Sequence, residues 1–180
     1  PSPDFMRPLA PTSDHEPKVE AWACLRCAIL LRPTFYTAGK VWHQTKFQNL
    51  RDNLGFPVKA RWIDLTDDCD IVQNHKDQLW TLCFEDVRDS DFVLLYCEDM
   101  NEEQRGALVE LGMAYGFGKS VYAVGSCKTI QPNKISDVAF THYPKFHWLP
   151  TSDLVIGAKM ALRIEETKKQ MIADIEKDAA

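Results

Sequence analysis

The residues Phe92–Cys97 (FVLLYC) restrict the fold of this chain most strongly, because the run is apolar throughout. A strand with one face in water alternates polar and apolar residues, whereas a strand inside a parallel sheet is buried on both faces. The run therefore predicts an interior parallel strand. An acidic loop at 98–104 and an amphipathic helix around 106–114 follow it, and this order is typical of α/β proteins.

Strand and helix patterns alternate along most of the chain. Strands are expected at 34–38, 58–63, 92–97, 120–124 and 146–149, and helices at 41–54, at 71–88, after Gly106 and from Leu154. Such alternation builds right-handed βαβ units, so we expect a three-layer α/β domain. The last helix is expected to be capped by Thr151, Ser152 or Asp153 and to fray over its charged end, 165–180.

A chain of 180 residues matches a single domain. Residues 1–33 begin with a proline-rich stretch, and the sequence leaves their structure open. We therefore expect an N-terminal arm at 1–33 and the α/β domain at 34–180. Cys24 and Cys27 have the spacing of half a zinc site, but no second ligand pair follows at usable spacing, so no metal is expected.

Composition excludes several classes of function. The net charge of −5 comes without a basic cluster, which argues against a partner that is a nucleic-acid polymer. No apolar run has the length of a membrane span, and no secretory signal is visible. The six scattered cysteines are typical of reduced thiols, so a cytoplasmic location is expected.

The carboxyl ends of the strands are the expected ligand site, because α/β sheets bind ligands at that edge. Candidate segments there are Tyr36–Gly39, Trp62–Asp64, Cys97–Asp99, Gly106–Glu110 and Gly125-Ser126. Asp91 lies at the opposite end, where a structural role is expected. Glu110 lies off the apolar stripe formed by Ala107, Leu108, Leu111, Ala114 and Tyr115, and the helix N-terminus is expected to favour its ionised form. The alternative interpretation is a solvated surface glutamate.

Several motifs occur in an order that resembles a known family. They are Tyr36-Thr37-Ala38-Gly39, Val58-Lys59-Ala60-Arg61-Trp62, Asp86-Val87-x-x-Ser90-Asp91, Arg105-Gly106-Ala107-x-x-Glu110-Leu111-Gly112-x-Ala114, and Gly118-Lys119-Ser120-Val121 with Gly125. Over residues 34–150 this order resembles the nucleoside 2-deoxyribosyltransferase-like superfamily, which includes the 2′-deoxynucleoside 5′-phosphate N-hydrolases.

The resemblance implies a flavodoxin- or Rossmann-like three-layer sandwich with a five-stranded parallel sheet, assembled into homodimers or larger oligomers. It also implies that Glu110 is a nucleophile and that Tyr36 lines the pocket near the sugar. Arg105, Gly106 and Ala107 would bind sugar or phosphate, and Gly39 of the first motif is a further candidate for substrate binding. The implied activity is cleavage of the N-glycosidic bond of a nucleoside or nucleotide, or base exchange, with no cofactor.

Cys83 departs from the family pattern, because it occupies the position of the acid that protonates or orients the base. Asp86, one helical turn later, and Asp99, at the end of the apolar strand, are the alternative acids. Trp62 is a candidate for stacking on a base, or else a core aromatic at a strand end. Arg105 is a candidate phosphate clamp, or else a surface residue that offsets the acidic loop.

Two other functions remain open on the sequence alone. The first is a catalytically weak nucleotide-binding module of the same fold, which is consistent with Cys83 at the acid position. The second is a flavodoxin-like redox or signalling domain. The sequence argues against this second alternative, because no Ser/Thr-rich phosphate loop follows the first strand and no lysine accompanies Glu98 and Asp99.

Overall fold

The computed structural model describes residues 32–66, 68–98, 104–125 and 142–179. These residues belong to a unit that begins at Pro33, except for Arg32. The arm expected at 1–33 lies almost entirely outside the described residues, as do Cys24, Cys27, Asp99 and Ser126.

The described residues form one parallel sheet, which confirms the α/β class. Its strands are β1 (Phe35–Ala38), β2 (Phe92–Cys97), β3 (Ser120–Gly125) and β4 (Phe146–Trp148), in the order β1-β2-β3-β4. Every residue of β2 is buried, as the apolar run predicts. Within this part of the chain the sheet has four strands, while five were expected.

The expected strand at 58–63 differs from the structure. Val58 makes an isolated parallel bridge to Phe35, and the chain then enters the 3₁₀ helix η2 (Arg61–Asp64). The carboxylate of Asp86 explains the change of direction, because its Oδ2 accepts the Arg61 backbone N–H at 2.7 Å. A backbone donor engaged in this way is not available to extend the ladder along β1.

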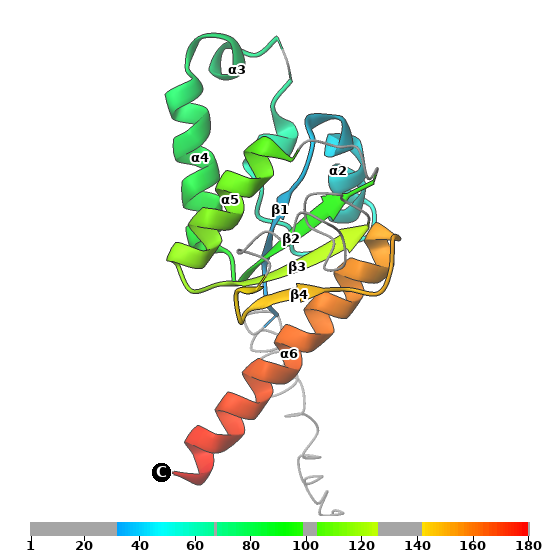
Figure 1. Ribbon diagram of the computed structural model, residues 1–180, viewed down its shortest axis with the longest axis vertical. Helices are drawn as coiled ribbons and strands as arrows, with labels where there is room; N and C mark the ends of the chain where they lie inside the picture. The colour runs from blue at the N-terminus through cyan, green and yellow to red at the C-terminus, as the bar shows by residue number, and fades with distance from the viewer. Residues whose placement is uncertain (1–31, 67, 99–103, 126–141, 180) are drawn as a thin grey trace, which may run out of the picture. The chain divides into compact units, whose positions relative to one another are not determined.

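Helices cover both faces of the sheet (Figure 1). The helices α4 (Lys76–Asp89) and α5 (Arg105–Gly116) lie on one face, and α5 contacts β1, β2 and β3. The other face carries α2 (Gln44–Asp52), which follows the 3₁₀ helix η1 (Val41–His43), and α6 (Leu154–Asp178). The three layers agree with the sequence-based expectation for a Rossmann-like fold.

The helix expected at 71–88 is two helices. The short α3 (Asp70–Asn74) ends at His75, whose φ of −128° and ψ of 55° are not helical, and α4 starts at the next residue. The imidazole of His75 pairs with Asp70 at 3.1 Å, so the residue that follows α3 contacts the first residue of the same helix.

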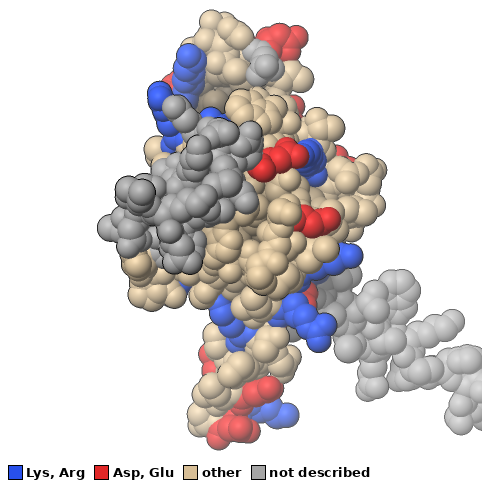
Figure 2. Space-filling model, turned by 45° about the vertical axis from the view of Figure 1, so that its right-hand side comes forward, with Lys and Arg blue, Asp and Glu red and all other residues tan. Residues whose placement is uncertain are grey.

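The last helix begins as expected and ends later than expected. Asp153 caps it, because its carboxylate accepts the Ile156 N–H at 2.9 Å. The helix does not fray at residue 165 but continues to Asp178, where its C-terminal turns extend beyond the sheet (Figure 1). In Figure 2 these turns, at the lower end of the view, carry acidic, basic and uncharged side chains together.

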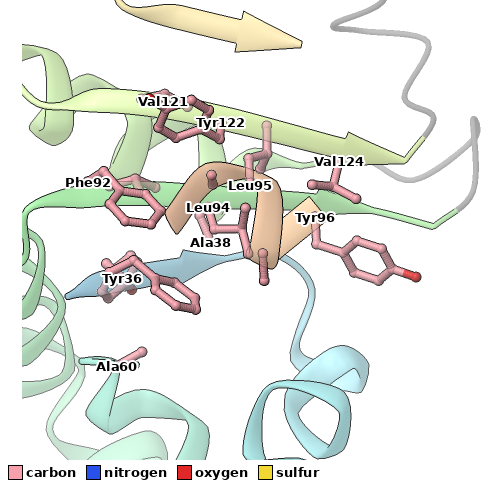
Figure 3. Packing of buried hydrophobic residues seen from close by; sticks show 14 of the residues in the cluster. Tyr36, Ala38, Ala60, Phe92, Leu94, Leu95, Tyr96, Val121, Tyr122 and Val124 are labelled. Carbon is pink, nitrogen blue, oxygen red and sulfur yellow. The ribbon is translucent and has the colours of Figure 1, made fainter. Parts of the chain in front are cut away.

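Side chains from adjacent strands form the core, as Figure 3 shows for β1, β2 and β3. The rings of Phe35 and Phe92 stack at 5.2 Å, and Tyr122 lies edge-on to Phe92 at 5.4 Å. At the end of β3, Gly125 has a φ of +96°, and a Cβ there would lie 1.8 Å from the Cys97 carbonyl oxygen. Only glycine therefore fits where β2 and β3 meet the ligand edge.

Two polar clusters fasten α6 to the sheet. Tyr122 donates a hydrogen bond to Glu165 at 2.6 Å, and Lys168 pairs with the same carboxylate at 2.8 Å. Asp91 accepts the Thr34 N–H at 2.7 Å and pairs with Lys169 at 2.8 Å. These contacts agree with the structural role expected for Asp91.

Candidate active site

Glu110 lies on the buried face of α5, which corrects its predicted place off the apolar stripe. The buried residues of the helix are Ala107, Glu110, Leu111 and Ala114. Only 8 % of Glu110 is exposed, although a carboxylate at this position would favour solvent. A buried acid on a packing face requires partners, and the structure provides them.

Tyr36 is the principal partner of Glu110. Its phenol, buried in β1, donates a hydrogen bond of 2.5 Å to Oε1 of Glu110. Burial and the neighbouring carboxylate raise the pKa of Tyr36 well above its usual value, so the hydroxyl keeps its proton. The predicted proximity of Tyr36 and Glu110 is present in the structure.

Burial raises the pKa of Glu110 to about 8, while hydrogen bonds from Tyr36 and Cys83 oppose the shift. At neutral pH the free protein therefore holds this carboxyl mainly in its protonated form. The sequence-based expectation of an ionised Glu110 is wrong for the free protein. The field of a helix terminus acts mainly within the first turn, and Glu110 is the sixth residue of α5.

Cys83 reaches the same carboxyl from α4. Its thiol interacts with both Glu110 and Tyr36, and burial raises its pKa to about 11. A thiol in this state remains a neutral, weak hydrogen-bond donor. It therefore supports Glu110 without adding the negative charge that an acid at this position would bring.

Glu110 and Cys83 line a pocket of about 210 Å³, and Tyr36 lies behind Glu110. The pocket is mainly apolar, and its lining comes from η1, α2, η2, α3, α4 and α5 and from the loops that follow β1 and η2. The lining residues are Gly39, Val41, Gln44, Trp62, Leu65, Val72, Leu79, Trp80, Cys83, Gly106, Ala107 and Glu110. The volume lies below the roughly 300–1,000 Å³ of pockets for drug-sized ligands, so it suits a flat ring with part of a sugar.

Hydrogen bonds to the backbone hold two of the lining side chains. The indole N–H of Trp62 donates to the Thr37 carbonyl at 3.0 Å, and the amide of Gln44 donates to the Leu65 carbonyl at 2.6 Å. At Gly39, a Cβ would lie 3.1 Å from the Phe47 ring and 3.3 Å from the Tyr96 carbonyl. The wall near β1 is therefore fixed before any ligand arrives.

Six of the predicted site residues come together here: Tyr36, Gly39, Trp62, Gly106, Ala107 and Glu110. Arg105 begins α5 beside Gly106 but does not line the pocket. Trp62 lies on the pocket wall, half-buried, rather than within the core.

Asp86 is placed with Arg61 rather than with Glu110. Its two carboxylate oxygens accept the backbone N–H and the Nε–H of Arg61, each at 2.7 Å. The other proposed acid, Asp99, lies outside the described residues. The structure thus gives Asp86 a structural contact and leaves its candidate role in proton donation without geometric support.

Sequence reasoning missed several lining residues. Leu79 and Trp80 lie on the face of α4 that also carries Cys83, and this helical spacing was available in the sequence. Gln44 had no comparable signal, because a polar residue at a helix start is ordinary and only the tertiary contact with the Leu65 carbonyl places it in the wall.

Three further findings concern the described residues only. No helix there is long and apolar enough to cross a membrane. No group of three or more His, Cys, Asp or Glu side chains has an arrangement that would hold a metal ion. A larger and more open hollow of about 1090 Å³, between α2 and the start of α6, contains none of the predicted site residues.

Comparisons with models of protein families, with curated proteins and with solved structures find no significant match to this chain. Any functional assignment therefore rests on the geometry of the pocket and on the resemblance of its motifs.

Proposed function

We propose that this protein cleaves the N-glycosidic bond of a nucleoside or nucleotide, or exchanges its base, through a covalent glycosyl intermediate on Glu110. The observation that supports this most strongly is the hydrogen bond of 2.5 Å between Tyr36 and Glu110 at the wall of a ring-sized apolar pocket. An oriented carboxyl group beside a space for a flat ring is what such a reaction requires.

In the proposed reaction, an oxygen of Glu110 attacks C1′ of the sugar as the bond between C1′ and the base nitrogen breaks. The base leaves with the electron pair of that bond and takes up a proton. Water or a second base then displaces the carboxylate from C1′, which makes the protein a hydrolase or a transferase. The positive charge that develops on the sugar favours the ionised form of Glu110 in a site with few polar groups.

Tyr36 and Cys83 are positioning residues in this proposal, since their hydrogen bonds stabilise the carboxylate relative to the neutral acid. Gly106 and Ala107, near the N-terminus of α5, offer backbone N–H groups to a sugar hydroxyl or a 5′-phosphate. Asp99 remains the proposed proton donor to the base.

The finer features of assembly and location belong to the same proposal. We propose that the isolated parallel bridge of Val58 to Phe35 supports a fifth strand at this edge of the sheet. We propose a homodimer or larger oligomer, as the resemblance implies. Among the described cysteines, Cys69 and Cys83 carry free thiols, which supports a reducing compartment such as the cytoplasm.

A nucleotide-binding module with weak chemistry is the second candidate. It is favoured by the raised pKa of Glu110, about 8, since a neutral carboxyl is a poor nucleophile. Cys83 at the position of the expected acid favours it as well.

Base release from a panel of nucleosides, 2′-deoxynucleosides and their 5′-monophosphates, followed by chromatography, tests the proposal. We expect free base with the native protein and none with Glu110→Gln. The matched control is Glu165→Gln, because Glu165 is also buried and bonded to a tyrosine but belongs to α6, outside the pocket lining. Binding without release would favour the second candidate, and absence of both would contradict both candidates.

A further inference from the structure

Gln44 is the lining residue whose contacts say most about the ligand. It begins α2, and its Nε2 donates to the backbone carbonyls of Leu65 at 2.6 Å and Trp62 at 3.4 Å. Both of these partners are acceptors. The amide nitrogen must therefore face them, because the reverse orientation would place the amide oxygen against two carbonyl oxygens.

The orientation of the nitrogen also fixes the orientation of the oxygen. Oε1 lies on the other arm of the planar amide and accepts no hydrogen bond from the described residues. Gln44 therefore gives the pocket an acceptor that is already oriented. Turning the side chain to offer its NH₂ group instead would break the contact with Leu65.

The other polar side chains of the described wall are committed or exposed. Glu110 accepts from Tyr36, and the Trp62 indole donates to the Thr37 carbonyl. Trp80 is 42 % exposed, so water reaches it. The oxygen of Gln44 is thus the acceptor in this part of the wall that awaits a donor from a ligand.

We propose that Gln44 makes the pocket select a base that carries an exocyclic amino group, such as adenine or cytosine. This inference rests on the proposed function, in which the pocket holds a nucleobase. The amino group would donate to Oε1 of Gln44, whereas a keto oxygen at the same place would face another oxygen. A ring without either group would leave the amide oxygen unsatisfied, which corresponds to about a tenfold loss of affinity.

The test is a cycle of two proteins and two ligands. The ligands are adenosine and the purine nucleoside that lacks only the amino group, each as ribo- and 2′-deoxyribonucleoside. The proteins carry Glu110→Gln, so that the ligand stays intact, with and without Gln44→Met, which preserves length and removes the amide. Calorimetry gives the dissociation constants. A second, independent measurement is the ratio of kcat/KM for the two ligands, determined with and without Gln44→Met in proteins that retain Glu110.

Gln48→Met is the matched control. Gln48 lies one turn further along α2 and donates to the Ile63 carbonyl of η2 at 2.7 Å, but it lines the larger hollow rather than this pocket. This variant therefore measures the effect of losing a hydrogen bond between α2 and η2 without a change in the pocket wall.

We expect Gln44→Met to weaken binding of adenosine about tenfold and to leave binding of the unsubstituted purine nucleoside nearly unchanged, while Gln48→Met leaves the ratio of the two unchanged. Equal weakening of both ligands by Gln44→Met would overturn the inference and leave the proposed function standing. Should the Glu110→Gln protein that retains Gln44 bind both ligands equally, the inference also falls, and no folding defect of the Gln44→Met variant affects that result. Failure to bind or cleave any nucleoside would overturn the proposed function together with the inference.

Discussion

The phenol of Tyr36 donates a hydrogen bond of 2.5 Å to Glu110, which joins β1 to α5 across 74 positions of the chain. Both groups are buried, and both have pKa values above their usual ones because burial disfavours their charged forms. The pair is therefore neutral at neutral pH, and as the pH rises Glu110 loses its proton before Tyr36 does. Its protonation state links stability, ligand binding and chemistry.

Replacement of Tyr36 by phenylalanine should raise the pKa of Glu110 further above 8, because the lost hydrogen bond favours the carboxylate. The midpoint of the rise of base release with pH should move upward accordingly, and unfolding in denaturant should show a loss of about 1–2 kcal/mol. Tyr122→Phe is the control, since it removes the comparable bond between β3 and Glu165 of α6. It should cost similar stability and leave the pH profile unchanged, and a profile that moves equally in both variants would contradict the assignment.

Replacement of Glu110 by glutamine should change how stability depends on pH. The folded pKa of Glu110, about 8, lies above its ordinary value of 4.5, so between these values the folded state holds a proton that the unfolded state releases. Native stability from this group is complete below pH 4.5 and falls by about 1.4 kcal/mol per pH unit towards pH 8. Glu110→Gln should lack this slope.

Denaturant unfolding of the native protein and Glu110→Gln at pH 5 and pH 8.5 measures the effect. The variant should match the native protein at the lower pH and exceed it at the higher one. A difference that does not depend on pH would show that the carboxyl is ionised in the folded protein throughout this range.

Replacement of Asp86 by asparagine should affect stability rather than chemistry. The carboxylate holds two N–H groups of Arg61 at 2.7 Å, at the point where the chain turns from the Val58 bridge into η2. We expect a loss of about 1–3 kcal/mol in denaturant unfolding and retained base release at permissive temperature. Complete loss of base release in a variant that remains folded would instead make Asp86 the acid.

Replacement of Gly106 by alanine should weaken nucleoside binding without destabilising the fold. A Cβ at Gly106 meets no atom within 4 Å, and the residue lines the pocket. The methyl group should stabilise the first turn of α5 by up to about 1 kcal/mol and weaken nucleoside binding by occupying space near the backbone. Gly112→Ala, with equally open surroundings on the same helix but outside the pocket lining, should stabilise without changing binding. Equal binding by both variants would place the ligand elsewhere.

Local sequence patterns were sufficient to predict the interior strands of the sheet, but they did not predict the structure at its edge beside β1. The apolar run at 92–97 predicted β2 because burial on both faces leaves a clear mark on the sequence. The segment 58–63 has strand-like composition, yet Asp86 diverts it through a contact with Arg61 that joins parts of the chain 25 positions apart. Such a contact is decided by tertiary structure and leaves no local signal.

The candidate site, too, could be predicted from the sequence only in part, because tertiary contacts decide the rest. The place of Glu110 in α5 and its nearness to Tyr36 came from the resemblance, whereas its burial depends on how α4 covers α5, which no helical periodicity reports. The raised pKa of Glu110 results from that burial, so it was predicted in the wrong direction. Gln44 became a candidate only through its contact with the Leu65 carbonyl.

The carboxylate of Asp91 joins the segment entering β1, the start of β2 and α6 through Thr34 and Lys169, at the end of the sheet remote from the pocket. We therefore expect native-state amide exchange to be slowest at that end, because these contacts hold it together and the pocket lies at the other end. Any adjustment to a bound molecule would be confined to the opposite edge of the sheet, in the parts of the pocket wall that no such contact holds.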